Sequence, residues 1–375
     1  MNSTAPDYQP EQQANELKIP PPDSDQIAIS QALFEKICTT AGTDKGIPFD
    51  EFMQLALYDP ELGYYSAGKY KIGKEGDFIT APELGPVFAY CVADQCEQIL
   101  HTISNGLILE AGAGHGELAI DLLLELEKRD ALPGQYLILE LSHSLRTVQR
   151  ETIQNTAPHL LERIEWLDAF PEDFHGVILG NELLDAMPAI QFEISETGPV
   201  LLNVKCGDTG LQYTYDKNQA SAEILSRLDP LKLPTGYRSE MNLQAEAWIR
   251  SAAASLSEGV MLLIDYGFPR TEYYHPQRQQ GTLMCHYRHH NHDNPFVLLG
   301  LQDITAHVDF TAMAEAAVDS DLDVIGYTSQ AAFLMMCGLE QLVNQSDPEN
   351  PVEHIGLTTQ INKLTHPSEM GSCSR

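Results

Sequence analysis

The sequence predicts an α/β fold, with a parallel sheet covered by helices, a helical N-terminal segment and an inserted antiparallel β region. From Leu107 onward, short apolar runs alternate with amphipathic segments, through "LILE", "YLILEL", "RIEWL" and "GVILG". This alternation is typical of βαβ units, in which a crossover helix follows each strand. A glycine turn follows the first run, at Gly112, Gly114 and Gly116. Ligands of open α/β sheets bind at such strand ends.

Composition favours a globular protein with an acidic surface. The 375 residues are 43% hydrophobic and 20% charged, and 22 Lys and Arg against 54 Asp and Glu give a formal net charge of −32. Such a surface repels nucleic acid and anionic membranes, so we expect neither as a partner. A basic protein partner suits it better.

Cysteine usage and hydropathy favour a reducing compartment. The seven cysteines are scattered and form no C-x-x-C pair. We therefore predict neither a disulfide framework nor a cysteine zinc site. The N-terminus lacks the layout of a signal peptide, and no apolar run approaches the length of a membrane span. A cytoplasmic protein is expected.

The N-terminal region divides into an arm and a helical segment. Residues 1–25 are rich in Pro, Gln, Asn and acids, so we expect a disordered arm. Residues 26–105 are expected to form a helical or lid segment, with helices at 30–40, for about ten residues from Pro48, and at 80–100. In the last of these, Thr80 and Glu83 fit a capping box.

The α/β core is predicted in two parts, at 106–190 and 245–345. Helices are expected at 117–128 and 143–154, between the apolar strands. Residues 191–244 alternate with period two and predict an antiparallel insertion. A helix at 241–257, the strand "GVMLLIDYGF", a His-rich loop at 281–295, a helix at 304–320 and a last strand at 322–330 follow, before a polar tail at 346–375.

The glycine turn admits three ligand classes, which the neighbouring residues separate. A P-loop needs Lys-Ser/Thr after its last glycine, but Glu117 and Leu118 stand there. A dinucleotide fingerprint fits from Gly114 to Ala119, but Glu110 at the strand end faces the pyrophosphate. S-adenosylmethionine (SAM) carries a sulfonium and an ammonium and no phosphate, so a carboxylate beside it is favourable.

Further acids complete the predicted SAM site. Glu140 ends the next strand, where its two oxygens can accept from both ribose hydroxyls. Asp168, after the third strand, is a candidate acceptor for the adenine amino group. The predicted cofactor-binding residues are Asp77, Glu110, Gly112, Ala113, Gly114, Gly116, Glu140, Asp168 and Asn181.

At a larger scale the sequence resembles the MidA-like family of SAM-dependent methyltransferases. The blocks "ALYDPELGYY", "GDFITAPELG", "LEAGAGHGEL", "GNELLDAMPAIQFE", "LLIDYGFPRTEYYHP", "GTLMCHYRHHNHDNP" and "QDITAHVDFTAMAEAA" carry the resemblance over residues 30 to 345. It implies a class I (Rossmann-like) SAM-methyltransferase fold. Mitochondrial relatives are implied to dimethylate an arginine symmetrically on a respiratory subunit.

The sequence departs from the family pattern in two places. Ala113 and His115 stand in the glycine loop where relatives have other residues, although the glycines remain. The chain stops at "PSEMGSCSR", where relatives continue into an apolar strand. The resemblance therefore implies a short or missing final strand.

Methyl transfer is predicted to depend on the segment "GNELLDAMP". Asn181, Glu182 and Asp185 follow the fourth strand, where carboxylates can orient a guanidinium and accept its proton. Asp77 is expected in a lid over the cofactor, and Asp265 and Tyr266 at the rim of the site. Tyr266 and Tyr287 are candidate aromatic walls for a cation.

The run "CHYRHHNHDNP" is expected to be a polar loop that holds no metal, with one of its histidines as an alternative base. We therefore expect a SAM-dependent methyltransferase that acts on arginine of a basic or arginine-bearing protein. The alternatives are an NAD-type oxidoreductase and a SAM-binding assembly factor without catalysis.

Overall fold

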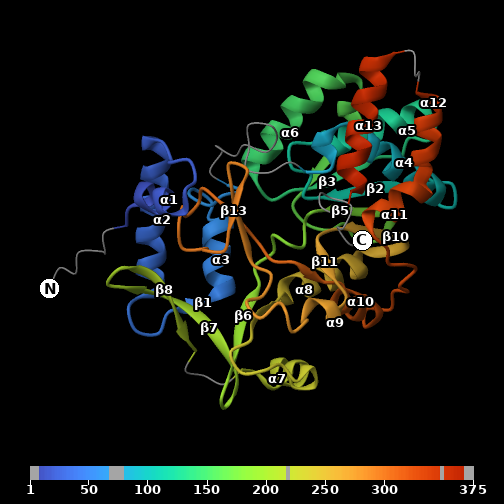
Figure 1. Ribbon diagram of the computed structural model, residues 1–375. Coiled ribbons are helices and arrows are strands. Elements are labelled where there is room, and N and C mark those ends of the chain that lie inside the picture. Colours follow the sequence, from blue (N-terminus) through green and yellow to red (C-terminus); the bar gives the residue numbers. More distant parts are fainter. Residues whose placement is uncertain (1–7, 67–79, 217–219, 347–349, 367–375) are drawn as a thin grey trace. The chain divides into compact units, whose positions relative to one another are not determined.

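The computed structural model describes residues 8–66, 80–216, 220–346 and 350–366 (Figure 1). The chain divides into two compact units, and each is described by itself. Unit 1 comprises Met1–Phe78, Asp185–Ala247 and Phe268–Ala312. Unit 2 comprises Ile79–Leu184, Trp248–Gly267 and Met313–Arg375.

Unit 2 is built on a five-stranded sheet whose neighbouring strands are all parallel. Its order is β10 (Leu256–Ile264), β5 (Phe174–Asn181), β2 (Leu107–Ala111), β3 (Tyr136–Leu139) and β4 (Ile164–Leu167). The predicted parallel sheet is confirmed. Because β2 lies between β5 and β3, the carboxyl ends of these three strands share one edge of the sheet.

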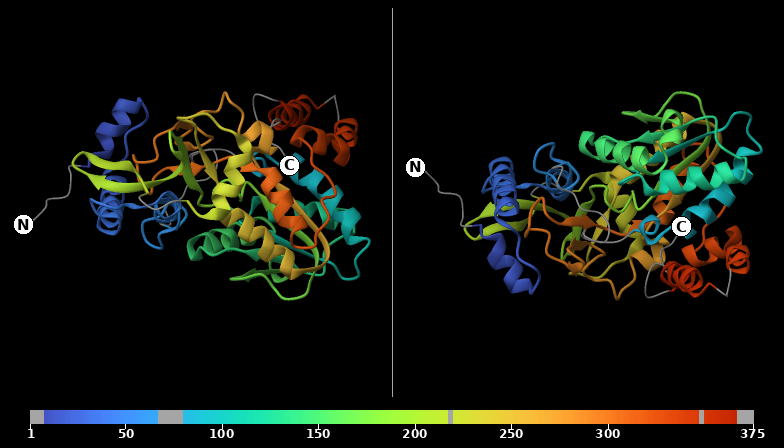
Figure 2. Two further views of the ribbon diagram at one scale, coloured as in Figure 1. Left: turned by 90° about the horizontal axis from the view of Figure 1, so that it is seen from below. Right: turned by 90° about the horizontal axis from the view of Figure 1, so that it is seen from above.

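Helices cover both faces of this sheet. They are α4 (Val87–Leu100), α5 (Glu117–Lys128), α6 (His143–Thr156), the part of α8 (Leu243–Ser255) from Trp248 onward, α11 (Gln330–Leu334), α12 (Glu340–Gln345) and α13 (Pro351–Thr365). Ile108 and Leu179 pack with α4, α5 and the C-terminal helices. Their neighbours Leu109 and Ile178 pack on the opposite face with Ala252 of α8. Figures 1 and 2 show α11–α13 beside α4 and α5.

The predicted strand at 322–330 is wrong. Residues 322–328 form no regular element, Ser329 caps α11, and Val324 and Ile325 are 51% and 81% exposed. Strand β10 is the end of the sheet within the described residues, so this apolar segment has no ladder partner there. A strand-like sequence without a partner does not form a strand.

The N-terminal helices of unit 1 begin earlier than expected. They are α1 (Pro10–Leu17), α2 (Ser24–Ala41) and α3 (Phe49–Tyr58). A disordered arm over residues 1–25 is therefore wrong for residues 8–25. Tyr8 stacks on Phe34 with ring centroids 4.4 Å apart and hydrogen-bonds Ser30 at 2.9 Å. The sparse apolar residues of this segment suffice because they anchor on α2.

Unit 1 contains the predicted antiparallel insertion. Its sheet has the order β1 (Ile47–Pro48), β7 (Gly198–Gly207), β6 (Ile190–Ser195) and β9 (Arg238–Met241), with β8 (Gly210–Tyr215) on β7. Because β1 pairs with β7, the N-terminal segment and the insertion belong to one unit. Residues 268–312 also belong to it, whereas the sequence placed them in the core. Its short helices are α7 (Ala222–Leu228) and α9 (Arg270–Tyr273).

The His-rich segment forms strands where a loop was predicted. β12 (Met284–Tyr287) pairs antiparallel with β13 (His290–His292) and with β14 (Asp303–Thr305). The hairpin turn uses positive φ at Arg288 (47°) and His289 (62°), residues that carry no usual hairpin signal. The helix expected at 304–320 is shorter, because β15 (Val308–Asp309) precedes α10 (Phe310–Val318).

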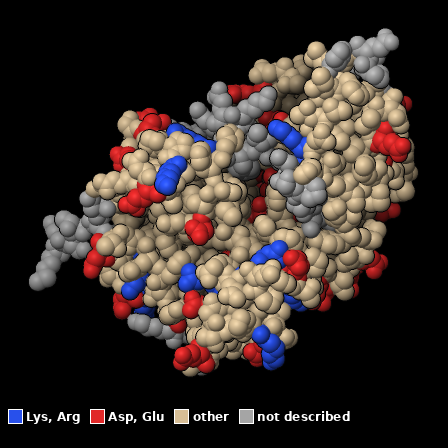
Figure 3. All heavy atoms as spheres, in the orientation of Figure 1, with Lys and Arg blue, Asp and Glu red and all other residues tan. Residues whose placement is uncertain are grey.

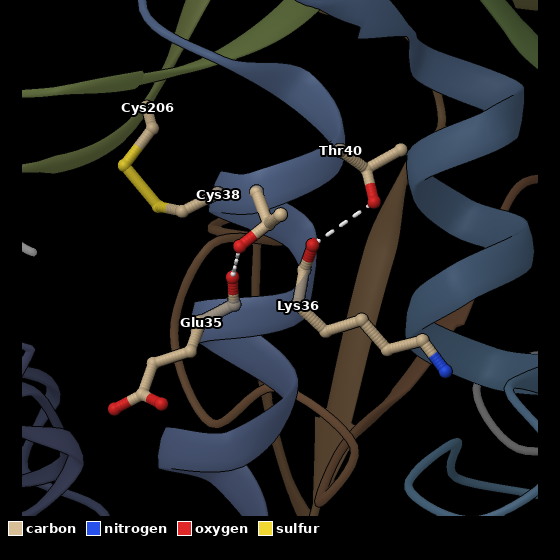
Figure 4. Close-up of a disulfide and its surroundings, with 6 residues drawn as sticks. Glu35, Lys36, Cys38, Thr40 and Cys206 are labelled. Carbon is tan, nitrogen blue, oxygen red and sulfur yellow. Dashed lines mark hydrogen bonds between the residues drawn. A yellow bond between two sulfur atoms is a disulfide. The ribbon is translucent and has the colours of Figure 1, made fainter.

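A disulfide joins Cys38 of α2 to Cys206 of β7 (Figure 4). The sequence predicted no disulfide framework, because one pair separated by 168 residues leaves no spacing pattern. Among the described residues, no helix has the length and apolar character needed to cross a membrane.

Candidate active site

The glycine turn lies between β2 and α5 at the carboxyl edge of the sheet. Gly112, Gly114 and Gly116 all have positive φ, at 68°, 52° and 91°. L-residues rarely adopt this region, so the turn requires glycine. The Gly112 N–H donates to the carbonyl oxygen of Leu139 over 3.1 Å, which ties the turn to β3. Ala113 between the glycines is buried.

Glu110 lies beneath this turn and is 2% exposed. The Tyr136 hydroxyl donates to Glu110 Oε2 over 2.7 Å. Burial raises the pKa of Glu110 to about 7, against the effect of the Tyr136 hydrogen bond. A cation bound beside it would favour the ionised carboxylate.

Glu140 follows β3 and is held by two donors. The Ser142 N–H donates to Oε1 over 2.9 Å, and Gln149 Nε2 lies 3.2 Å from Oε2. Burial raises the pKa of Glu140, and these hydrogen bonds oppose that rise. Gln149 also donates to the carbonyl oxygen of Gly114 over 2.9 Å, so it connects Glu140 to the glycine turn.

Asp168 is placed differently from the other predicted acids. Its side chain is 83% exposed and forms an ion pair with Arg146 at 2.6 Å. Arg146 also donates to the carbonyl oxygens of Glu140 and Leu167. The strand ends of β3 and β4 are thereby joined through one guanidinium.

The segment after β5 approaches the glycine turn. Asn181 ends the strand, and its Oδ1 is buried and meets no donor within the part of the chain that the structure describes. Glu182 follows with φ 48°, and its N–H donates to the carbonyl oxygen of Ile264 over 2.8 Å. Leu183 lies against the turn, since a Cβ added to Gly112 would be 2.9 Å from Leu183 Cδ1.

The segment that begins at Thr80 meets Glu182 through the backbone of Ala81. The Ala81 N–H points at Glu182 Oε1 over 3.5 Å, and the Thr80 N–H donates to Glu83 Oε2 over 2.8 Å. The expected bond from Glu83 back to Thr80 is thus present, but it precedes a 3₁₀ turn (Pro82–Leu84) rather than α4 itself. Burial raises the pKa of Glu83 to about 7, with Glu117 adding to the rise.

Three predicted residues do not lie among the described residues of unit 2, which form this edge of the sheet. Asp77 lies outside the described residues. Asp185 begins the second segment of unit 1, is 8% exposed, and its carbonyl oxygen accepts from the Ala306 N–H. Tyr287 is buried in unit 1. In the His-rich segment and the other described residues, no group of His, Cys, Asp and Glu could hold a metal ion.

Sequence reasoning missed Tyr136 and Gln149, and it gave Asp265 no particular role. Tyr136 and Gln149 contact predicted residues but lie within a strand and a helix, where apolar or helical periodicity accounts for them. Asp265 directly follows β10, and this strand-end position led to its expected place at the rim of the site, but no local pattern indicated its hydrogen bonds to the segment after β5.

The residues present fit SAM. Three glycines leave the backbone of the turn accessible, and Asn181 Oδ1 is a buried acceptor that lacks a donor among the described residues. Glu110 and Glu140 end adjacent parallel strands, which suits an ammonium and a ribose. When bound, SAM supplies an electrophilic methyl group.

This parallel sheet, with a glycine turn after β2 and acids at the ends of β2 and β3, defines a class I SAM-methyltransferase fold. Residues 91–328 match the family described as S-adenosyl-L-methionine-dependent methyltransferase. The chain belongs to that family and is a SAM-dependent methyltransferase. The dinucleotide alternative from Gly114 to Ala119 is therefore wrong.

Solved structures and curated relatives agree with this assignment. A Burkholderia thailandensis protein crystallised with S-adenosyl-homocysteine is 42% identical, with a TM-score of 0.90, over 95% of this chain and 93% of that chain. The Drosophila melanogaster homolog of the mitochondrial protein arginine methyltransferase NDUFAF7 is 28% identical over 93% of this chain and 84% of the relative. The Danio rerio NDUFAF7 is 25% identical over 92% and 86%. These relatives confirm the resemblance to the MidA-like family.

The comparisons contradict the expected cytoplasmic location. The curated relatives from Drosophila melanogaster, Danio rerio and Bos taurus are named as mitochondrial proteins. The scattered cysteines and the N-terminus without a signal-peptide layout were the wrong guide, because neither property is specific to one compartment.

Proposed function

We propose that this methyltransferase modifies an arginine side chain of a protein substrate and that Glu182 holds the guanidinium. The carrying observation is the position of Glu182 directly after β5, with Leu183 against the glycine turn. The names of the curated relatives, which are protein arginine methyltransferases, support the substrate class.

The reaction is a single displacement. A guanidinium nitrogen forms a bond to the methyl carbon, the carbon–sulfur bond breaks, and its electron pair remains on sulfur as a thioether. The nitrogen then loses a proton. Glu182 would accept two guanidinium N–H groups, orient the nitrogen in line, and take up that proton. Asn181 would orient the cofactor or substrate through its side-chain amide.

The remaining predicted residues serve the cofactor in this proposal. Glu110 would face the positive charge of SAM, and Glu140 would accept from the ribose hydroxyls. Gly112, Ala113, Gly114 and Gly116 would let the cofactor lie against the backbone. Asp168 stays a predicted acceptor for the adenine amino group. Asp77 stays a predicted residue of a lid over the cofactor. Asp185 stays a predicted third acid of the loop.

The overall charge supports a basic target. Asp and Glu side chains are spread over the visible face (Figure 3), in keeping with the net charge of −32. A surface of this sign accelerates association with a cationic partner, and the effect weakens as salt rises.

The test is transfer of labelled methyl groups from SAM to lysate proteins, followed by mass spectrometry of the modified residues. We expect label on arginine, with transfer by Glu182→Gln slowed about 100-fold or more but still measurable, while the variant still binds S-adenosyl-homocysteine. The matched control is Glu151→Gln, an exposed position in α6, which is expected to keep full transfer.

Label on lysine, histidine or a small molecule would overturn the arginine assignment. Full activity of Glu182→Gln would remove Glu182 from the mechanism. Cofactor binding with no transfer to any target would instead support the assembly factor without catalysis.

A further inference from the structure

Asp265 occupies a buried position directly after β10, where its carboxylate accepts three backbone N–H groups from two segments of the site edge. Its side chain is 1% exposed. Oδ2 accepts from the N–H groups of Leu183 and Leu184 over 3.0 and 2.8 Å. Oδ1 accepts from the Tyr266 N–H over 2.8 Å. One carboxylate therefore connects the end of β10 to the segment after β5. Asp265 and Leu183 are 82 residues apart in the sequence.

The segment that Asp265 holds is strained. Glu182 has φ 48°, a region that non-glycine residues occupy only when their surroundings impose it. Asn181, the residue before Glu182, is held in the sheet, since it pairs with Ile264 of β10 at the end of β5. Glu182 itself is fixed by its N–H bond to the Ile264 carbonyl oxygen. The two residues after it are fixed by Asp265.

The hydrogen bonds from Leu183 and Leu184 to Asp265, here called the Asp265 clamp, also affect the glycine turn. The N–H of Leu183 donates to Asp265, and the Leu183 side chain packs against Gly112. A Cβ added to Gly112 would be only 2.9 Å from Leu183 Cδ1. A shift of the backbone at 183 would therefore move Leu183 off the turn and change the direction of Glu182 together.

We propose that Asp265 is a positioning residue, whose carboxylate fixes the 182–184 backbone so that Glu182 faces the substrate and Leu183 closes the glycine turn. The inference about Glu182 rests on the proposed function. The inference about the loop and the turn does not, because it concerns hydrogen bonds and packing within unit 2.

The direct test is Asp265→Asn, which keeps the shape of the side chain but puts an NH₂ group against one set of backbone donors. Hydrogen exchange followed by mass spectrometry measures the amides of Leu183 and Leu184, and calorimetry measures S-adenosyl-homocysteine binding. In the unmodified protein both amides are expected to exchange slowly. In the variant both amides should exchange at least about tenfold faster, because their charge-assisted hydrogen bonds are lost or weakened. Binding of S-adenosyl-homocysteine should weaken about 3- to 10-fold.

The effect on catalysis separates positioning from mere stability. We expect kcat to fall about 10- to 100-fold in Asp265→Asn with KM for SAM changed less. In the double variant with Glu182→Gln, the second substitution should add little, because Asp265 acts through Glu182. Independent, multiplicative effects would overturn the proposal.

The matched control is Asp59→Asn in unit 1. Asp59 is also buried and also accepts from two consecutive N–H groups, those of Glu61 and Leu62, at 3.2 and 3.1 Å. This variant is expected to leave the exchange of Leu183 and Leu184 unchanged.

Fast exchange of Leu183 and Leu184 in the unmodified protein would overturn the clamp even if Asp265→Asn did not fold. Slow exchange and the predicted change on substitution, without arginine methylation, would support the clamp and reject the proposed substrate. The two failures are therefore distinguishable.

Discussion

Gln149 Nε2 donates to the carbonyl oxygen of Gly114 over 2.9 Å, so one side chain of α6 holds the centre of the glycine turn. The same nitrogen lies 3.2 Å from Glu140 Oε2, while Gln149 Oε1 accepts from the indole N–H of Trp166 over 2.8 Å. The amide therefore sets both the turn and the predicted ribose acceptor, although it need not touch the cofactor.

Replacing Gln149 by Ala should weaken S-adenosyl-homocysteine binding about 3- to 10-fold, the effect of losing one or two hydrogen bonds. Calorimetric titration measures this. Gln135→Ala is the control, because the Gln135 side chain donates at the surface to the exposed Glu165 carboxylate, over 2.9 Å. Equal affinity in both variants would show that the turn holds its shape without Gln149.

Substituting Glu110 by Gln should weaken SAM binding about 10- to 100-fold, because a carboxylate facing a cation contributes more than a neutral amide. Gln keeps an oxygen that can accept from Tyr136, so thermal unfolding at pH 5, where the Glu110 carboxyl holds its proton, should change little. SAM affinity equal to that of the unmodified protein would remove Glu110 from the cofactor site.

Cofactor binding should strengthen as pH rises from 6 to 8. Burial raises the pKa values of Glu110 and Glu83 to about 7. Of the two, Glu110 is the predicted cofactor contact, so the loss of its proton in this range is expected to favour a bound cation. Titration of SAM in two buffers of different ionisation enthalpy should show proton release near pH 7, and Glu110→Gln should reduce it. Binding that is flat across the range would contradict the assignment.

The same shifts fix the sign of the stability dependence without ligand. The folded carboxyls hold protons more tightly than the unfolded ones, so the stability they contribute is full below about pH 4 and is lost as pH rises through about 7. Thermal melts at pH 5 and pH 8, compared between the unmodified protein and Glu110→Gln, measure this contribution.

Gly112→Ala should disrupt the turn. Its φ of 68° costs an L-residue about 1–2 kcal/mol, and the new methyl would press on Leu183. We expect S-adenosyl-homocysteine affinity to fall about tenfold, the equivalent of 1.4 kcal/mol. Gly326→Ala, where an added Cβ meets nothing within 4 Å, is the control and should bind normally.

The Cys38–Cys206 disulfide should stabilise unit 1. A bond that closes a loop of this length contributes about 2–4 kcal/mol, chiefly by restricting the unfolded chain. Reductant, or Cys38→Ser, is expected to lower the melting temperature, and Cys91→Ser serves as the buried, unpaired control. Alkylation of both Cys38 and Cys206 in the native, unreduced protein would show that the bond is absent.

Most of the fold of unit 2 was predictable because its signals are local. Short apolar runs placed β2, β3 and β5, helical periodicity placed α5 and α6, and the three glycines placed the turn. The acids at strand ends followed from the rule that parallel strands meet at one edge. The failures, at residues 8–25, 284–292 and 322–328, are segments whose structure depends on a distant partner or on the lack of one.

The sequence by itself determined the parallel sheet, the glycine turn and the positions of Glu110, Glu140 and Glu182, since residue periodicity and backbone preference act over a few positions. Only the tertiary structure decided that Asp265 holds Leu183 and Leu184, that Gln149 supports Gly114, and that Cys38 meets Cys206. These contacts join residues 35 to 168 positions apart. Such pairs become neighbours only when packed strands and helices bring them together, and no local pattern specifies them.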